Sequence, residues 1–333
     1  MAISHTPSTL PGEVWSREHI AALKEEVAAS GLHISGTESV NIHDAIKTGS
    51  PERDMYIDNY FMPVFDWTRT ELARVRPDGS TVLAYTQEAV DALDPENMFE
   101  SIAGDTNGTI MPGWEPELLE RSMPVCNKYD INMAIHPDAP AWSVFGLPRI
   151  IINKANILRM MAMVDDPHNG VTFCSGSYGT NLENDLPDMI RSLKGRIHFT
   201  HVRNLKFNSP TDFEEAAHLS TDGTFDMYEI MKALYDIGFE GPVRPDHGRM
   251  IWDEVAMPGY GLYDRALGAA YLNGLWEGKQ RLFPSEIRQI SRNRKDHGKS
   301  ILGPLRRRQY LPRLPGNGRG RGCGKTAEAG SGK

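Results

Sequence analysis

Four short apolar segments of this chain each end in a residue type that can bind a metal ion. INMAIH ends at His136, VTFC at Cys174 and RIHFTH at His201, and GPVRPDHG carries Asp246 and His247 near its end. Imidazole, thiolate and carboxylate groups together form a mixed nitrogen, sulfur and oxygen set. Such a set suits Zn²⁺, Fe²⁺ or Mn²⁺, whereas Mg²⁺ and Ca²⁺ prefer oxygen ligands alone.

The elements between these segments indicate how the five residues could meet. Apolar spacing predicts helices over 148–164, from Asn184 or Asp185 through Leu193, over 224–238 and over 262–276. Strands that alternate with helices form a parallel sheet of the α/β class. In a parallel barrel, side chains at the carboxyl ends of successive strands face one mouth. One histidine or cysteine at a strand end is more often structural, but four consecutive strands ending this way favour a shared metal site.

The N-terminal half of the chain is less regular. Ser16 can cap a helix, and a strand is expected after that helix over 32–39. A further strand is expected over 60–67. Between residues 70 and 123 the pattern predicts only a short helix near 86–94.

Further residues could act beside the predicted ligands. Tyr260 lies in a loop after the last ligand-bearing strand, where a phenol could transfer a proton or simply pack the loop. Arg203 and Arg244 are close to ligand positions and could pair with a substrate carboxylate. Arg244 could equally serve as a structural partner for acidic groups. His43 follows the strand expected over 32–39 and could reach the same mouth.

Three other histidines have less specific settings. His198 is expected to face the opposite side of its strand from His201 and to pack against a helix. His168, in the loop DDPHNG, is expected to be solvated. His218 could line the mouth of the barrel or close a helix.

Composition narrows the class of protein. Of 333 residues, 40% are hydrophobic and 24% are charged, which is typical of a globular protein in water. The sequence holds no run of about 18 apolar residues, so we expect no membrane-spanning helix. Three scattered cysteines and an N-terminus unlike a secretory signal favour a cytoplasmic location.

The net charge of −8 conceals two different parts. Residues 279–333 carry 15 Lys and Arg against 3 Asp and Glu, whereas residues 1–278 carry 21 against 41. The acidic body argues against nucleic-acid binding by the main domain. We therefore expect a catalytic domain over 1–278 and a basic tail over 279–333, rich in Gly, Arg and Pro and disordered. A solvated extension is a simpler account of this tail than a nucleic-acid-binding role.

Many separate motifs resemble those of the mannonate dehydratase family, in the family's order, over about residues 4–278. They include ESVNIHDAIKTG, AIHPDAP, FCSGSYG, IHFTHVRN, EEAAHL, RPDHGRMIWDE and PGYGLYDRA. The resemblance implies a TIM-type (β/α)8 barrel of the xylose-isomerase-like kind. It also implies a hydro-lyase that dehydrates D-mannonate to 2-keto-3-deoxy-D-gluconate, with Mn²⁺ or Fe²⁺, in hexuronate (glucuronate) degradation.

The family's site motifs fall on residues already singled out. Its PGY tyrosine matches Tyr260, and its metal motifs match the strand-end positions His136, Cys174, His201, Asp246 and His247. In the implied reaction a base takes the proton from C2, an acid helps the C3 hydroxyl leave, and a metal stabilises charge on the carboxylate. Tyr260 is expected to transfer one proton, and Asp246 or His247 to have a metal-linked role. The sequence leaves open which group is the acid and which the base.

Three departures from the family pattern predict an incomplete barrel. The family's first strand and helix are missing before AISH, and segments are shortened near residue 60 and over 95–125. Six strands and an N-terminal fragment can be counted, whereas eight close the barrel. Exposed strand edges would favour homo-oligomers or aggregation. The alternatives to an active dehydratase are an inactive remnant of the family and a metal-dependent sugar isomerase, which would normally use a carboxylate-rich site rather than Cys174.

Overall fold

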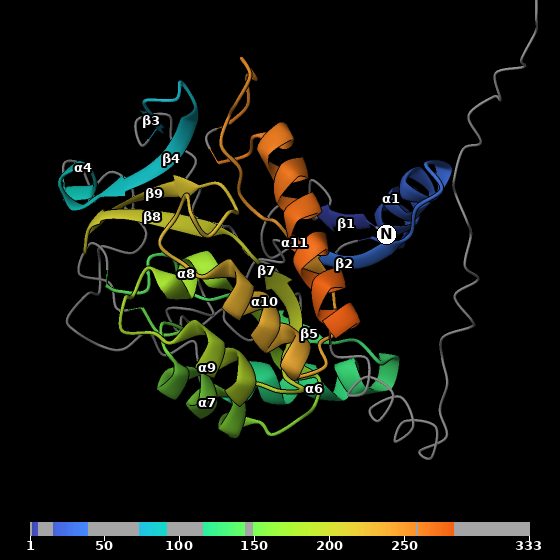
Figure 1. The fold of residues 1–333 in the computed structure, drawn as a ribbon. Coiled ribbons are helices and arrows are strands. Elements are labelled where there is room, and N and C mark those ends of the chain that lie inside the picture. The colour runs from blue at the N-terminus through green and yellow to red at the C-terminus, as the bar shows by residue number, and fades with distance from the viewer. Residues whose placement is uncertain are drawn as a thin grey trace, which may run out of the picture. The chain divides into compact units, whose positions relative to one another are not determined.

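The computed structural model describes residues 2–5, 16–38, 73–91, 116–143, 149–257 and 259–282, which belong to one compact unit, Met1–Ile287 (Figure 1). His43, the strand predicted over 60–67 and residues 283–333 lie outside this described part of the chain.

A four-stranded parallel sheet carries the strand ends that the sequence indicates. Its strands are β5 (Met133–Ile135), β6 (Asn169–Cys174), β7 (Ile197–His201) and β10 (Val243–Arg244), in the order β10-β7-β6-β5. All six residues of β6 are buried, which is typical of a parallel strand covered on both faces. Cys174 and His201 are partners in the register of β6 and β7, so their side chains start from the same level of the sheet.

Capped helices follow these strands. The helices are α7 (Lys154–Met163), α9 (Leu186–Ser192) and α10 (Met227–Asp236), and a short α8 (Ser175–Gly179) follows β6 directly. Asn153, Asp185 and Asp226 precede the three longer helices, and their side chains accept backbone N–H bonds of the first turn. The caps fix where each chain segment turns back along the sheet.

Two details of these helices differ from the sequence expectation. The helix predicted from residue 148 begins at 154, because Asp138 Oδ2 accepts the N–H groups of Ile150 and Ile151 at 2.8 Å each and holds them outside the helix. In the helix predicted over 224–238, the apolar spacing predicts that Tyr228 faces the core, but Tyr228 is 40% exposed and Lys279 Nζ lies 3.2 Å from the centre of its ring.

The apolar faces of the helices pack with the sheet into one core. Its most buried members include Phe173, Ile157, Ile190, Met231 and Leu234, each with at most 2% of its surface exposed. Burial of such side chains contributes about 25 cal/mol for each Å² of apolar surface removed from water. This core therefore fixes the strand ends on which the candidate ligands lie.

The N-terminal segment forms a second, smaller parallel sheet. β1 (Ala2–His5) pairs with β2 (Ile34–Glu38), and α1 (Arg17–Ala29) lies between them in sequence. Ser16 caps α1, as predicted, by accepting the N–H of His19 at 3.2 Å. The N-terminal fragment counted in the sequence is thus a strand, and the strand expected over 32–39 is confirmed.

An antiparallel sheet lies beside the parallel one and was not expected from the sequence. Its strands are β3 (Ala73–Val75), β4 (Thr81–Thr86), β8 (Asn204–Ser209) and β9 (Asp212–Ala216), in the order β3-β4-β9-β8 (Figure 1). Tyr85 stacks on Phe213 across β4 and β9, with ring centres 5.1 Å apart. Because β8 starts three residues after His201, this sheet lies next to the carboxyl end of β7.

The remaining helices complete the described part of the chain. α4 (Gln87–Asp91) confirms the short helix predicted near 86–94, and α6 (Pro116–Tyr129) precedes β5. α11 (Leu262–Leu282) follows the loop that carries Tyr260 and extends six residues beyond the predicted end at 276. Within the described ranges, no helix has the length and apolar character needed to cross a membrane.

These elements confirm the predicted α/β class. The parallel strands alternate with helices in the order of a TIM-type (β/α)8 barrel, and Glu38 at the end of β2 contacts His201 and Arg244 at the ends of β7 and β10. Hydrogen bonds join the six parallel strands of the described residues into a pair and a row of four. The shortened segments near 60 and over 95–115 lie outside those residues.

The packing of α9 gives a stability test. Ile190 is fully buried, so Ile190→Ala is expected to lower the free energy of unfolding by about 3 kcal/mol through lost burial and a residual cavity. Leu158 on α7 is 42% exposed, and Leu158→Ala is expected to lower it by about 1 kcal/mol or less. Urea unfolding measures both values, and equal losses would contradict this packing.

Candidate metal centre

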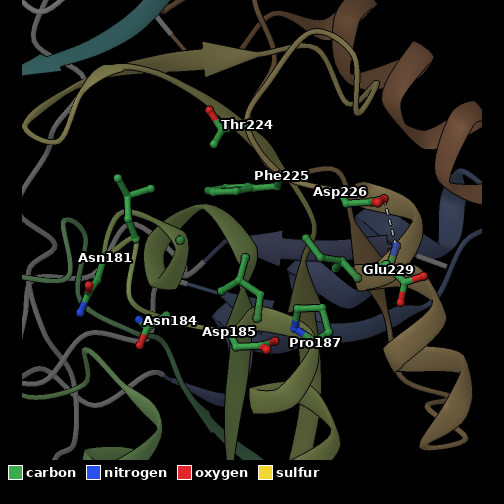
Figure 2. Close-up of a pocket in the computed structure, with 12 residues that line it drawn as sticks. Asn181, Asn184, Asp185, Pro187, Thr224, Phe225, Asp226 and Glu229 are labelled. Atoms are coloured by element: carbon green, nitrogen blue, oxygen red, sulfur yellow. Dashed lines mark hydrogen bonds between the residues drawn. The ribbon is translucent and has the colours of Figure 1, made fainter.

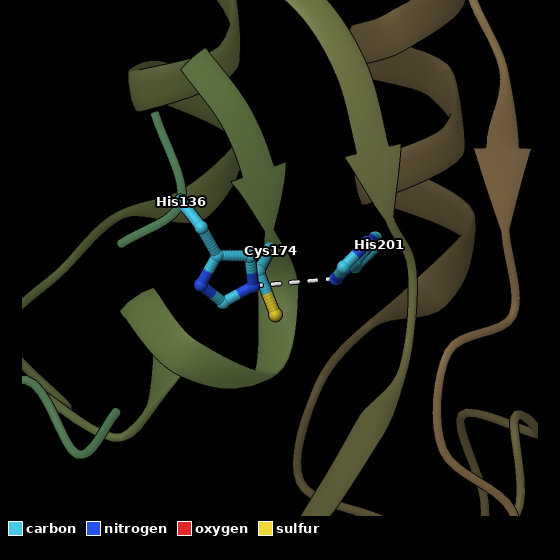
Figure 3. Close-up of side chains that lie close together, drawn as sticks. All are labelled: His136, Cys174 and His201. Carbon is cyan, nitrogen blue, oxygen red and sulfur yellow. Dashed lines mark hydrogen bonds between the residues drawn. The ribbon is translucent and has the colours of Figure 1, made fainter. Parts of the chain in front are cut away.

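Three of the predicted ligands converge at the carboxyl ends of β5, β6 and β7 (Figure 3). One ligand atom from each of His136, Cys174 and His201 lies within 4.8 Å of the other two. His136 Nε2 lies 3.3 Å from His201 Nδ1. Cys174 and His201 are buried, whereas His136, just beyond β5, is exposed. Two nitrogens and one sulfur thus face a common point that is open on the His136 side.

Both imidazole rings are held by the nitrogen that faces away from this point. His136 Nδ1 donates to the carbonyl oxygen of Pro137 at 2.7 Å. His201 Nε2 donates to Glu38 Oε1 at 2.5 Å. Metal-binding histidines usually donate their second N–H in this way, which fixes the tautomer and the ring orientation. The other ring nitrogens, His136 Nε2 and His201 Nδ1, are therefore oriented toward the common point.

Cys174 is surrounded by groups that stabilise a thiolate. Its Sγ accepts the backbone N–H of Ser177 at 3.3 Å and the Ser177 hydroxyl at 3.1 Å. Burial raises the pKa of the Cys174 thiol, but the positive charge of Arg203 and hydrogen bonds with His136 and His201 outweigh it, and the pKa lies well below its ordinary value. The thiolate is the form of cysteine that binds metals.

Asp246 borders the same point from the turn after β10. Its Oδ1 lies 3.3 Å from His201 Nδ1 and its Oδ2 lies 3.9 Å from Cys174 Sγ. Burial raises the pKa of Asp246, but the charges of His201, His247 and Arg203 outweigh it and hold the pKa well below its ordinary value. The backbone of Asp246 is left-handed, with φ of 63°, a conformation that is uncommon away from glycine and often found at functional sites.

His247 and Tyr260 lie beside this carboxylate. His247 Nδ1 donates to Glu215 Oε1 at 2.6 Å, and its Nε2 lies 3.9 Å from Asp246 Oδ2. The rings of His247 and Tyr260 are 5.5 Å apart. Gly248 and Tyr260 also form a β-bridge, which holds the tyrosine loop against the turn that carries His247. Two groups capable of proton transfer are thus adjacent to the candidate ligands.

The two predicted substrate arginines both contact carboxylates of the chain. Arg203 is buried and pairs with Glu215, and its Nε lies 3.0 Å from Asp246 Oδ2. Arg244 pairs with Glu38 and lies 3.8 Å from Asp246 Oδ1. The site therefore contains alternating positive and negative groups, several of them buried.

A cavity of about 270 Å³ lies away from these residues, between the starts of α9 and α10 (Figure 2). Phe225 and Leu186 contribute apolar surface to it, and Asp185 and Asp226 contribute the carboxylates that cap the two helices. None of the candidate ligands lines it.

Comparisons with known proteins identify the family. The family model for D-mannonate dehydratase matches residues 1–123 and 118–286. A curated mannonate dehydratase from Brachyspira hyodysenteriae is 56% identical, over 81% of this chain and 89% of that protein. The chain belongs to the mannonate dehydratase family. A mannonate dehydratase from Thermotoga maritima is 47% identical, over 81% of this chain and 88% of its own.

A solved member of the mannonate dehydratase family also has this fold. The crystal structure of mannonate dehydratase from Streptococcus suis serotype 2 matches with a TM-score of 0.77 and 38% identity, over 84% of this chain and 86% of that chain. The family assignment predicted from the motifs is therefore confirmed by sequence and by structure.

Two carboxylates at the mannonate dehydratase site were missed by the sequence analysis. Glu38 is the last residue of β2, and the strand-end rule that indicated the histidines applies to it as well. Glu215 lies within β9, which the sequence did not predict; it belongs to the motif EEAAHL, but no strand end pointed to it. Both orient a histidine: Glu38 holds His201, and Glu215 holds His247.

The three other histidines considered in the sequence are not among the converging ligands. His218 is buried, donates to the Pro245 carbonyl at 2.7 Å and packs against Gly268 of α11, where a Cβ would lie 2.3 Å from its Nδ1. His198 packs against Gly170 of β6. His168, expected to be solvated, has a side chain only 15% exposed and bonds to Asn132 at 2.8 Å.

The contact between Glu38 and His201 predicts an effect on metal affinity. Glu38→Gln removes the charge that orients His201 Nε2–H, so the affinity for Mn²⁺ is expected to fall about 10- to 100-fold. Competition with a chromophoric chelator measures this affinity. Glu183→Gln, in an exposed loop, serves as the matched control and should leave it unchanged. Equal affinities in the two variants would contradict an orienting role for Glu38.

Proposed function

We propose that this chain is a metal-dependent hydro-lyase that converts D-mannonate into 2-keto-3-deoxy-D-gluconate and water. The observation that carries the proposal is the convergence of His136, Cys174 and His201 within 4.8 Å, in a chain 56% identical to a mannonate dehydratase. We place the reaction in hexuronate (glucuronate) degradation in the cytoplasm. We also propose that the chain acts as a homo-oligomer, because β5 and β10 are edge strands of the four-stranded row formed by the described residues, and strand edges favour association.

The donor set supports Mn²⁺ or Fe²⁺ as the ion. Two imidazole nitrogens, a thiolate and the Asp246 carboxylate are ligands that such divalent ions accept. His247 was predicted as a fifth ligand, and we assign its Nε2 to proton transfer instead. The second nitrogen of each converging imidazole is already hydrogen-bonded, as expected of a ligand. When bound, the ion supplies Lewis-acid stabilisation for the negative charge that develops on the substrate carboxylate.

The reaction requires two proton movements. The C2–H bond breaks and its proton passes to a base, while the electron pair forms a double bond between C2 and C3. The C3–O bond breaks, and the departing oxygen takes a proton from an acid and leaves as water. The resulting enol then becomes the 2-keto acid by moving a proton to C3. A positioned base and acid are therefore both needed.

His247 and Tyr260 are the groups we assign to these steps. Because Nδ1 of His247 donates to Glu215, its Nε2 carries the lone pair that can accept a proton. The Tyr260 ring lies 5.5 Å from the His247 ring, so its hydroxyl is the adjacent donor for the departing oxygen. Asp246 carries a buried negative charge next to His201 and is assigned a metal-linked role.

The predicted substrate contacts stay predictions. Arg203 already pairs with Glu215 and Asp246, and Arg244 pairs with Glu38. A sugar acid could therefore bind only to guanidinium nitrogens that take no part in these pairs. His43 also keeps its predicted substrate role. A metal-dependent sugar isomerase is the alternative chemistry on such a barrel, and the thiolate of Cys174 argues against it because isomerase sites are normally carboxylate-rich.

Turnover of D-mannonate tests the proposal. The purified chain with Mn²⁺ or Fe²⁺ is expected to form a 2-keto acid, and His201→Ala to lower the rate at least about 100-fold by removing a ligand. His168→Ala, at the opposite end of the sheet, is the matched control and should retain the rate. A folded chain without turnover with either ion, or equal rates in the two variants, would overturn the proposal.

A further inference from the structure

One arginine beside the site differs from the others in its contacts. Arg203, Arg244 and Arg249 each pair with carboxylates of the chain. Arg265, in the first turns of α11, has no ion pair and no hydrogen bond with any residue in the described ranges, and its Nε is buried without a partner. Arg265 as a whole is only partly buried, but a guanidinium whose Nε is buried without a partner is costly, which makes such a group a candidate to bind an anion.

The acidic groups near Arg265 are already used. Asp264, its neighbour in sequence, bonds to Arg249 through both carboxylate oxygens at 3.0 Å. Glu254 accepts the backbone N–H groups of Leu262 and Tyr263 at the start of α11. Neither carboxylate forms an ion pair with Arg265 within the described residues, although the charge of Glu254 acts on it from a distance.

The side chain of Arg265 crosses the turn that carries His247. A Cβ on Gly248, the next residue, would lie 2.6 Å from Arg265 Cγ and 2.6 Å from the Gly261 carbonyl oxygen. Gly248 is also bridged to Tyr260. The absence of a side chain at Gly248 thus lets the Arg265 stem pass between the turn after β10 and the tyrosine loop.

The electrostatic surroundings of Arg265 are those of the site. Burial lowers the pKa of Arg265, and so does the like charge of Arg244, while Asp246 and Tyr260 act in the opposite direction. An arginine nevertheless stays protonated in proteins. A negatively charged ligand bound here would offset the free-energy cost of partly burying the guanidinium. It would also offset the repulsion between Arg265 and Arg244.

We infer that Arg265 binds the carboxylate group of the sugar acid. A guanidinium can hold a carboxylate through two parallel charge-assisted hydrogen bonds. Such a contact would select a sugar acid over the neutral sugar of the same carbon skeleton, because the neutral sugar leaves the cation unpaired. The inference rests on the proposed function, and it names a specificity-determining residue in addition to the predicted Arg203, Arg244 and His43.

Arg265→Gln and Arg265→Lys test the inference in the full metal-loaded chain. Arg265→Gln is expected to raise KM for D-mannonate about 10- to 100-fold, the effect of losing a charge-assisted contact. Arg265→Lys, which keeps the charge without the planar fork, should give an intermediate KM. The Mn²⁺ affinity and the melting temperature of both should match the unaltered chain. Arg191→Gln, in an exposed ion pair on α9, is the control and should leave KM unchanged.

Inhibition by D-mannose separates a charge contact from general damage. The neutral sugar lacks the carboxylate, so its inhibition constant should not change in Arg265→Gln. An unchanged KM for D-mannonate in Arg265→Gln would overturn the inference. Equal weakening of D-mannonate and D-mannose binding would also overturn it. So would a raised KM that comes together with a lower Mn²⁺ affinity and a lower melting temperature.

Failure of the inference about Arg265 can be distinguished from failure of the proposed function. If the unaltered chain does not turn over D-mannonate, the proposed function fails. Calorimetric titration of D-mannonate into the Mn²⁺-loaded chain and into Arg265→Gln then decides the inference by itself. Weaker binding to the variant supports it, whereas equal binding, or no binding to either chain, overturns it.

Discussion

The buried carboxylate of Asp246 is the charge on which most of the site depends. His201 Nδ1 and Arg203 Nε lie 3.3 and 3.0 Å from it, and His247 Nε2 lies 3.9 Å away. A carboxylate removed from water is stable only when opposite charges and hydrogen bonds replace its hydration. Because Asp246 also adopts a left-handed backbone, its surroundings must hold both its charge and its conformation. Loss of one partner would leave an uncompensated buried charge, at a cost of about 3–5 kcal/mol.

The same charges connect segments that are far apart in the sequence. Glu38 links the end of β2 to His201 on β7 and Arg244 on β10. Glu215 on β9 links Arg203 to His247 and so joins the antiparallel sheet to the parallel one. The metal centre and the junction of the sheets therefore use one network of charges. Binding of a metal to this network is expected to stabilise the fold as well as the site, since ligands that bind the native state favour it.

The sequence predicted the parts of the structure that follow from apolar periodicity and strand ends. His136, Cys174 and His201 meet because carboxyl ends of parallel strands share one edge, which is a general property of the α/β class. The antiparallel sheet escaped prediction because its strands mix apolar with charged residues: Glu214 is buried through ion pairs with Arg74 and Arg76 rather than through apolar character. Such pairs depend on tertiary contacts between distant segments, so hydrophobic patterning does not reveal them. The start of α7 likewise depended on a distant aspartate, which accepts the N–H groups before it.

The central claim, that the thiolate of Cys174 and the two imidazoles hold one divalent ion, is tested most directly by cobalt substitution. Co²⁺ titrated into the chain is expected to bind in one equivalent and to give a thiolate-to-cobalt charge-transfer band in the ultraviolet. The band should be lost in Cys174→Ser and retained in Cys126→Ser, which alters another buried cysteine, on α6. A band that persists in Cys174→Ser, or Co²⁺ bound by the unaltered chain without the band, would contradict the account.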